Sequence, residues 1–402
     1  MTIDRYAEER IRSWLLSVAP DRMPDHVLPT TFERTRRLAQ TSRRRRWVFR
    51  SMRLLPFAFA AGALAIALVA VNLPFAGQEL PPGAVNFSLT STISGQWTSA
   101  SETAFTVQRD PADNRTYYWR AAIYDRVDMD TWRTSNDTTT TRPRDARLLE
   151  GLADDVDEIG RHSVTFTVMP GLFRGATVLS PATPVSVNQD VELTTVGQDG
   201  FFASVRRAGD GAYRVTALVA EIGAGDGMLN VSTLRGAGMD YSPELVDLYT
   251  AQSEAVLGPN VTALRDEIVA TAESTAPYDI AARLVEVLRG PDYTYDTDVR
   301  DLDCASISIA ECFATFKRGY CQYYATTMAV VLRDLGIPAR LVEGFLPGQR
   351  DPGTGTELVP MSNAHAWVEV YFPGYGWVAF DPTGGGVAQL PAELPSGPPI
   401  EN

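Results

Sequence analysis

The stretch Arg318-Gly-Tyr-Cys-Gln-Tyr-Tyr-Ala325 decides the fold of this chain, because it places a cysteine at the start of a predicted helix. Apolar residues follow at helical spacing until Gly336 and Pro338 end the pattern. The partial positive charge at a helix N-terminus stabilises a thiolate, and the N–H groups there can bind a developing oxyanion. Gly319 lets the chain pass close to its neighbours before the helix. The sequence therefore predicts that Cys321 is a nucleophile.

A histidine and an aspartate follow in segments that read as strands. Residues 365–372 alternate in the manner of a strand, 373–376 form a turn sequence, and a returning strand ends at Asp381. In such a hairpin Asp381 lies beside His365. A thiol needs a base to become a good nucleophile, and that base needs a third group to orient it.

Each of these residues also has an ordinary interpretation when it is taken alone. A single cysteine at a helix start is commonly buried, a histidine on a strand is commonly structural, and an aspartate before Pro-Thr is commonly a turn residue. The chain has only three histidines and three cysteines in 402 residues. Their order and flanking sequences favour a Cys321–His365–Asp381 catalytic triad.

These motifs resemble the transglutaminase-like superfamily, and they are most similar to its membrane-anchored bacterial branch. The likeness is carried by RGYCQYYATTMAVVLRDLGIPARLVEG at 318–344 and AHAWVEVYFPGYGWVAFDPT at 364–383, and it covers roughly residues 275–385. Residues 118–133, with Tyr-Trp-Arg-Ala-Ala-Ile-Tyr-Asp at their start, are similar to a segment that precedes the catalytic core in that branch.

The resemblance implies an α+β fold with a papain-like core, in which a helix bearing the cysteine packs on an antiparallel sheet. It implies that Cys321 is the nucleophile, His365 the base and Asp381 the orienting acid. It also implies a thiol enzyme, although members of the superfamily include cross-linking enzymes, amidases and proteases.

Charge and hydropathy predict a membrane anchor near the N-terminus. Residues 1–53 carry 13 arginines and 6 acids, whereas the whole chain has a net charge of −13. Residues 54–76 then form an apolar run without a charged residue, which is long enough to span a bilayer. The positive-inside rule places the N-terminus in the cytoplasm and the acidic body outside it. A cleaved signal peptide is the competing interpretation, but 53 residues are a long lead-in.

The chain therefore divides into five predicted parts. They are a cytoplasmic basic segment (1–53), a transmembrane helix (54–76), an extracytoplasmic β-rich domain resembling a sandwich (84–235), a helical lead-in with the catalytic domain (240–388), and a flexible tail (389–402).

The other two cysteines, Cys304 and Cys312, match no Cys-x-x-Cys metal or redox pattern. Outside the cytoplasm they can form a disulfide, and otherwise they are two free core thiols. The aspartates between residues 292 and 303 do not have the spacing of an EF-hand loop, and a solvated loop is the simpler interpretation. We expect no metal and no cofactor.

The sequence thus predicts a single-pass thiol enzyme that transfers acyl groups from protein or peptide amides through a thioester on Cys321. Its expected partners are a protein or peptide substrate outside the cytoplasm and the membrane, and the acidic exterior argues against nucleic acid. Two alternatives stay open: a cysteine peptidase or amidase that hydrolyses envelope peptides, and an inactive binding scaffold.

Overall fold

A computed structural model describes residues 87–385, with gaps at 98–99, 136, 155–159, 174 and 221–228. The predicted basic segment 1–53, the apolar run 54–76 and the tail 389–402 lie outside these described residues. Within the part that is described, no helix combines the length and the apolar character needed to cross a membrane.

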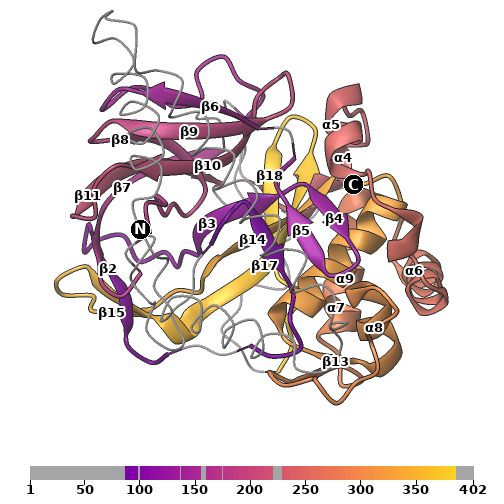
Figure 1. Cartoon of the computed structure of the whole chain (residues 1–402). Helices are drawn as coiled ribbons and strands as arrows, with labels where there is room; N and C mark the ends of the chain where they lie inside the picture. Colours follow the sequence, from indigo (N-terminus) through magenta and orange to yellow (C-terminus); the bar gives the residue numbers. More distant parts are fainter. Residues whose placement is uncertain are drawn as a thin grey trace, which may run out of the picture. The chain divides into compact units, whose positions relative to one another are not determined.

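Helices and strands alternate irregularly along the chain (Figure 1). The strands are β1 (Thr90–Thr92), β2 (Thr103–Arg109), β3 (Trp119–Tyr124), β4 (Arg126–Asp128), β5 (Thr131–Arg133), β6 (Asp137–Arg142), β7 (Arg161–Pro170), β8 (Thr183–Val187), β9 (Val191–Val196), β10 (Phe201–Arg207), β11 (Tyr213–Ala220), β12 (Thr294–Tyr295), β13 (Arg318–Gly319), β14 (Ala339–Phe345), β15 (Gln349–Arg350), β16 (Thr356–Pro360), β17 (Ala364–Phe372) and β18 (Gly376–Phe380). The helices are α4 (Val231–Gly236), α5 (Pro243–Tyr249), η1 (Glu254–Val256), α6 (Pro259–Thr271), α7 (Pro277–Leu288), α8 (Ile309–Phe316), α9 (Cys321–Asp334) and η2 (Met361–Asn363).

The predicted hairpin forms one side of a four-stranded antiparallel sheet with the order β18-β17-β14-β3, in which β18 is an edge strand. β17 and β18 pair from Val368 with Phe380 to Phe372 with Gly376. β14 lies on the other side of β17, where His365 is opposite Gly344. The hairpin prediction is thereby confirmed, and the pairing brings the chain after Phe380 back toward the start of β17.

The helix predicted after Cys321 is α9, and it packs against β14 and β17. Its apolar positions Ala325, Met328, Ala329 and Leu332 have no exposed area. α7 and α8 cover other faces of the same helix, so that α9 is buried on nearly every side. Figure 1 shows the helices on one side of β14 and β17 and the strands β7 to β11 on the other.

The strands of residues 84–235 do not form a separate sandwich. β3 pairs with β14 of the catalytic sheet, and β2 pairs with β16 in a six-stranded sheet of order β15-β16-β2-β7-β11-β8. The remaining strands of this region form two three-stranded sheets, β1-β5-β4 and β10-β9-β6. Because backbone hydrogen bonds join β2 and β3 to strands more than 200 residues later, the two predicted parts are interleaved.

A buried group of charges holds β3, β14 and β17 together. Arg120 donates to Glu369 Oε1 at 3.0 Å, and Arg340 donates to Glu369 Oε2 at 2.8 Å. Asp154 accepts from Arg340 at 3.3 Å and from the Trp377 indole at 3.0 Å. Burial raises the pKa of Glu369, but the two guanidinium groups outweigh burial and lower it, so that the carboxylate stays charged. Removing one partner of such a group leaves an uncompensated buried charge.

The structure pairs Cys304 with Cys312, so the first of the two alternatives left open for these residues is the one observed. Cys312 is on α8, and the bridge ties the loop before α8 to that helix. The closed loop is short, with a sequence separation of 8.

We expect the double substitution Cys304→Ala/Cys312→Ala to lower the free energy of unfolding by about 2–3 kcal/mol, because the bridge restricts the unfolded chain. Urea unfolding of the two proteins measures the difference. A reducing agent should shift the midpoint of the parent protein toward that of the variant and leave the variant unchanged. Equal midpoints with and without reductant would contradict this role of the bridge.

Candidate functional site

The start of α9 carries Cys321, with the chain arriving from β13. A Cβ atom at Gly319 would lie 2.6 Å from Tyr323 Cβ, so only glycine allows this approach and the sequence prediction for Gly319 is confirmed. Tyr320 occupies the N-cap position, and no side chain caps the helix. The first N–H groups of α9 are therefore not taken by a capping side chain.

The residue after Cys321 fixes the beginning of α9 to the sheet. The Gln322 amide donates to Glu343 Oε1 and to Ser91 Oγ, and Glu343 Oε2 accepts from Tyr124 at 3.0 Å. Burial raises the pKa of Glu343, while the hydrogen bonds from Ser91, Gln322 and Tyr124 lower it. This network joins β1, β3 and β14 to the turn of helix that presents Cys321, and no local pattern in the chain predicted it.

His365 and Asp381 meet at the end of the sheet next to α9. His365 Nε2 lies 2.8 Å from Asp381 Oδ2, and the two residues are 1% and 2% exposed. The backbone N–H of Thr383 donates to Asp381 Oδ1 at 2.9 Å. This pairing fixes the orientation of the imidazole ring, so that Nδ1 is the nitrogen available to another group.

The thiol of Cys321 is the third member of this group. Burial lowers the pKa of His365, but the charge of Asp381, its hydrogen bond and the interactions with Cys321 raise the pKa to about 10. Burial likewise raises the pKa of Asp381, and the contacts with His365, Thr383 and Tyr118 outweigh burial and lower it. The structure thus joins His365 on β17 to Asp381 in the segment after β18 by a hydrogen bond, and Cys321 at the start of α9 is close enough to influence the pKa of His365.

Tyr118 is a fourth member of the cluster that the sequence analysis did not assign to the site. Its hydroxyl donates to Asp381 Oδ2 at 2.8 Å. Its ring packs edge-on against His365 and Trp367, with centroids 6.0 and 5.2 Å apart. Tyr118 directly precedes β3, so the pairing of β3 with β14 delivers this hydroxyl to the site. A pairing between segments so far apart leaves no local signal.

Tyr295 is a fifth member, and it was also missed. It belongs to β12, which pairs in parallel with β13 and places Tyr295 opposite Gly319. Burial raises the pKa of its hydroxyl, and Cys321 and Asp381 are both close enough to influence it. In the sequence Tyr295 lies inside the acidic run, between Asp292 and Asp296, and no local pattern assigned it to the site.

The acidic run before α8 holds the approach to Cys321 by ion pairs. Arg318 contacts Asp296 at 2.7 Å and Asp301 at 2.9 Å, and Arg300 contacts Asp298 at 2.6 Å. Among the described residues, no group of three or more His, Cys, Asp or Glu side chains is arranged to hold a metal ion.

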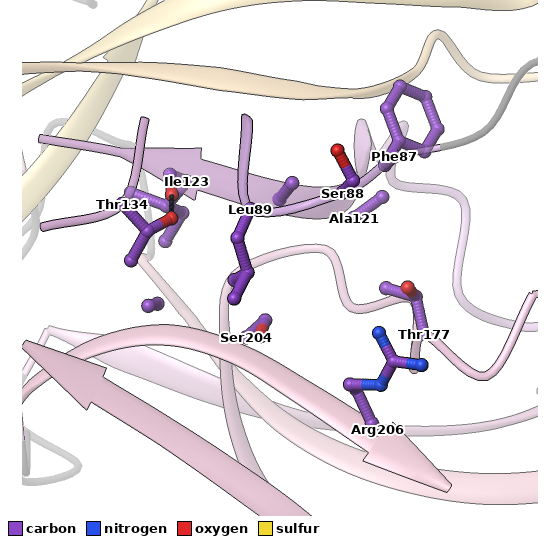
Figure 2. Close-up of a pocket in the computed structure, with 11 residues that line it drawn as sticks. Phe87, Ser88, Leu89, Ala121, Ile123, Thr134, Thr177, Ser204 and Arg206 are labelled. Carbon is purple, nitrogen blue, oxygen red and sulfur yellow. Dashed lines mark hydrogen bonds between the residues drawn. The ribbon is translucent and has the colours of Figure 1, made fainter. Parts of the chain in front are cut away.

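Two cavities lie away from Cys321. The crevice in Figure 2 lies between β3 and β10, with Leu89, Ser204 and Arg206 among its lining residues, and its volume of about 20 Å³ suits one water molecule. A larger hollow of about 360 Å³ is lined by residues of the six-stranded sheet, of the loop after β14 and of η2: Thr103, Pro347, Gly348, Gln349, Leu358, Pro360 and Asn363. Neither cavity contains a residue of the triad.

Comparison with known proteins agrees with this arrangement. The family model of the transglutaminase-like superfamily matches residues 262–382. The uncharacterized protein YebA of Bacillus subtilis is 48% identical over 73 residues, which are 17% of this chain and 10% of YebA. A protein-glutamine gamma-glutamyltransferase of Pseudomonas aeruginosa is 33% identical over 125 residues, which are 31% of this chain and 18% of that enzyme. The chain thus matches only a tenth to a fifth of the length of these two relatives.

Among solved structures, the periplasmic domain of TgpA from Pseudomonas aeruginosa has a similar fold. The TM-score is 0.53 at 21% sequence identity, and the match covers 74% of this chain and 94% of that domain. At this identity the likeness concerns the fold alone. The family match nevertheless spans α6 to the residue after Asp381, so residues 262–382 of this chain are a transglutaminase-like superfamily domain.

Proposed function

We propose that this chain is a membrane-anchored thiol enzyme that transfers acyl groups from protein or peptide amides through a thioester on Cys321. The observation that carries the proposal is the meeting of His365 with Asp381 at 2.8 Å beside the thiol that begins α9. A nucleophile, a base and a group that orients the base are the elements such a reaction needs.

In the proposed reaction, the raised pKa of His365 keeps the thiol proton on its Nδ1, and Cys321 Sγ attacks the carbonyl carbon as a thiolate. The new C–S bond forms as the π electron pair moves onto the carbonyl oxygen. When that pair returns, the C–N bond breaks, and His365 gives its proton to the leaving amine. An amine or a water molecule then attacks the thioester and releases Cys321. Asp381 keeps the imidazole oriented throughout, because Nε2 remains hydrogen-bonded to it.

A glutamine side-chain amide is the acyl donor we favour. The support is the resemblance to a relative named as a protein-glutamine gamma-glutamyltransferase. A cysteine peptidase or amidase uses the same thioester and differs only in giving it to water. Exclusion of water from the thioester separates the two outcomes.

The inactive scaffold is favoured by one observation: Cys321 has no exposed area in the structure. A substrate therefore has to displace a neighbouring side chain to reach the sulfur. The buried histidine–aspartate pair argues for activity, because an unused charge pair of this kind has a desolvation cost without a compensating function.

The proposed location is the outer side of a cell membrane, with residues 54–76 as the anchor and the N-terminus in the cytoplasm. The disulfide between Cys304 and Cys312 supports it, since such bonds persist in oxidising compartments.

We expect the full chain in detergent to release ammonia from a glutamine peptide and to incorporate an added primary amine. Cys321→Ala should lower both rates at least about 1,000-fold, because the nucleophile is lost. Lys317→Arg is the matched control: it removes the only lysine of the chain, keeps the charge and should react at the parent rate. Ammonia release without amine incorporation would favour the amidase. No reaction of the parent protein, together with slow labelling by iodoacetamide, would favour the scaffold.

The His365–Asp381 pair should also make stability depend on pH. The pKa of His365 rises from about 6.5 in the unfolded chain to about 10 in the folded protein. Its contribution is therefore complete below pH 6.5 and is lost as the pH rises from 6.5 toward 10. Between these pH values, the urea midpoint of the parent protein should fall more than that of His365→Gln. His162→Gln, outside the site, should keep the parent slope. Parallel curves for parent and His365→Gln would count against the charged pair.

Tyr118 should act as a positioning residue for Asp381. We expect Tyr118→Phe to lower kcat about tenfold, which corresponds to the loss of one hydrogen bond to a charged group. The Tyr118 hydroxyl lowers the pKa of Asp381, so its removal should raise that pKa. The acid limb of the pH–rate profile of Tyr118→Phe should therefore move to higher pH. Tyr117→Phe is the control, since the Tyr117 hydroxyl contacts Asp113 and His162 and not the site. Equal pH profiles for the two variants would show that Tyr118 acts only through packing.

A further inference from the structure

The residue that follows the nucleophile is held by two other segments of the chain. The side-chain amide of Gln322 donates to Glu343 Oε1 on β14 at 2.5 Å and to Ser91 Oγ on β1 at 3.1 Å. Ser91 Oγ in turn donates to the same Glu343 oxygen at 2.6 Å. The three side chains thus form a closed ring of hydrogen bonds. Because Gln322 is in the first turn of α9, this ring fixes the turn that presents Cys321.

The carboxyl group of Glu343 has neutral partners. Its second oxygen, Oε2, accepts from the Tyr124 hydroxyl at 3.0 Å, and Oε1 accepts from the Gln322 amide and the Ser91 hydroxyl. The residue is only 4% exposed, and burial raises its pKa although these hydrogen bonds lower it. Glu369, in contrast, is paired with two guanidinium groups. A buried carboxyl group with neutral partners costs stability, and this cost at the nucleophile helix indicates a role other than folding.

The strand that carries Ser91 is also docked on α9 at a second point. Ser91 is paired with Trp132 of β5, and the Trp132 indole donates to Thr326 Oγ1 in the second turn of α9 at 2.9 Å. Shortly after β1, the Ser94 carbonyl oxygen accepts from the hydroxyl of Tyr320. The same short segment therefore holds the residues on both sides of the nucleophile.

We infer that Glu343 and Ser91 are positioning residues for the nucleophile, which act through Gln322 on the first turn of α9. This inference rests on the proposed acyl transfer. The thiolate of Cys321 and the first N–H groups of α9 have to face the same carbonyl group, and a misplacement of about 1 Å costs about 100-fold in rate. The role needs no contact with the substrate and no proton transfer. The ring of Ser91, Gln322 and Glu343 keeps the turn in the orientation that the attack requires.

Exchange of the two side chains tests this geometry. Gln322→Glu sets one carboxyl group against another in place of the 2.5 Å hydrogen bond, so the ring is broken. Glu343→Gln alone preserves the ring, because the new carbonyl oxygen accepts from Gln322 and Ser91 while the new NH2 group donates to the Tyr124 hydroxyl oxygen. In the double substitution, the NH2 group at position 343 donates to the carboxylate at position 322. The bond then forms again with donor and acceptor exchanged.

With the full chain in detergent, we expect Gln322→Glu to lower kcat for a glutamine peptide by about tenfold or more, while KM changes by less than about twofold. Glu343→Gln alone and the double substitution should both keep kcat within about threefold of the parent. Acylation of Cys321 by p-nitrophenyl acetate should follow the same order, because it needs the same alignment of thiolate and carbonyl group. Urea unfolding of every variant shows that it is folded in the assay.

Ser91→Ala is a milder variant, because Ser91 is half-buried and the other two members of the ring stay in place. It should slow both reactions by about threefold or more. Ser88→Ala is the matched control, since the exposed Ser88 hydroxyl donates to the Thr90 carbonyl oxygen. Glu357→Gln is the control for a buried carboxylate: Glu357 is 1% exposed and accepts from the Trp119 indole, away from α9. This variant should lower the urea midpoint and retain the parent rates.

Three results would overturn the inference. A lower urea midpoint of Gln322→Glu with the parent kcat would mean that the ring stabilises the fold without positioning the nucleophile. The same loss of kcat in Gln322→Glu and in the double substitution would mean that the bond between positions 322 and 343 is not what matters. If Gln322→Glu is unfolded in the assay, Ser91→Ala decides, and parent rates in that variant refute the role.

Failure of the proposed function gives a different pattern. A parent protein that is acylated by p-nitrophenyl acetate but does not process glutamine peptides would refute the proposed substrate, and the effect of the ring would still be measured in the acylation rate. A parent protein that carries out neither reaction would refute the acyl transfer, and the inference would be refuted with it.

Discussion

The pairing of β3 with β14 is the constraint on which the rest of this structure depends. β3 contributes an edge to the sheet that carries His365, and it does so from more than 200 residues earlier in the chain. The same strand delivers Arg120 to Glu369 and, from the residue before it, Tyr118 to Asp381. A shift of this strand by one residue would turn each side chain to the opposite face of the sheet. The register of β3 on β14 therefore determines both the packing of the sheet and the position of Tyr118 in the candidate site.

Buried polar groups surround the site and are matched by specific partners. Glu369, Glu343 and Asp381 are each at most 6% exposed, and each accepts hydrogen bonds from at least two different groups. For Glu369 and Asp381, partner charges and hydrogen bonds overcome the effect of burial on the pKa, whereas for Glu343 burial prevails. The region thus combines two carboxylates that stay charged, Glu369 and Asp381, with a carboxyl group, Glu343, that is more easily protonated. Because the local dielectric is low, each of their hydrogen bonds is stronger than it would be in water.

Sequence patterns predicted those features of the fold that depend on residues close together in the chain. The helix after Cys321, the hairpin from His365 to Asp381 and the approach permitted by Gly319 were all readable, because each depends on residues close together in the sequence. The hairpin pattern also placed Asp381 beside His365, and these two side chains are hydrogen-bonded. Tyr118 and Tyr295 were not readable as parts of the site, since pairings between distant strands place them there. The expected separate β domain failed for the same reason: alternation reveals a strand but not its partner.

The pairing of β2 with β16 has a consequence for how the chain is made. Residues 103–109 leave the ribosome about 250 residues before their partner at 356–360. β7 covers one edge of β2 much earlier, but the other edge must wait until almost the whole catalytic segment has been synthesised. During that interval a strand with bare backbone donors and acceptors is available to any extended segment nearby. Biogenesis of this protein therefore has a vulnerable interval that ends only when β16 docks, and a chaperone that shields open strand edges would act during it.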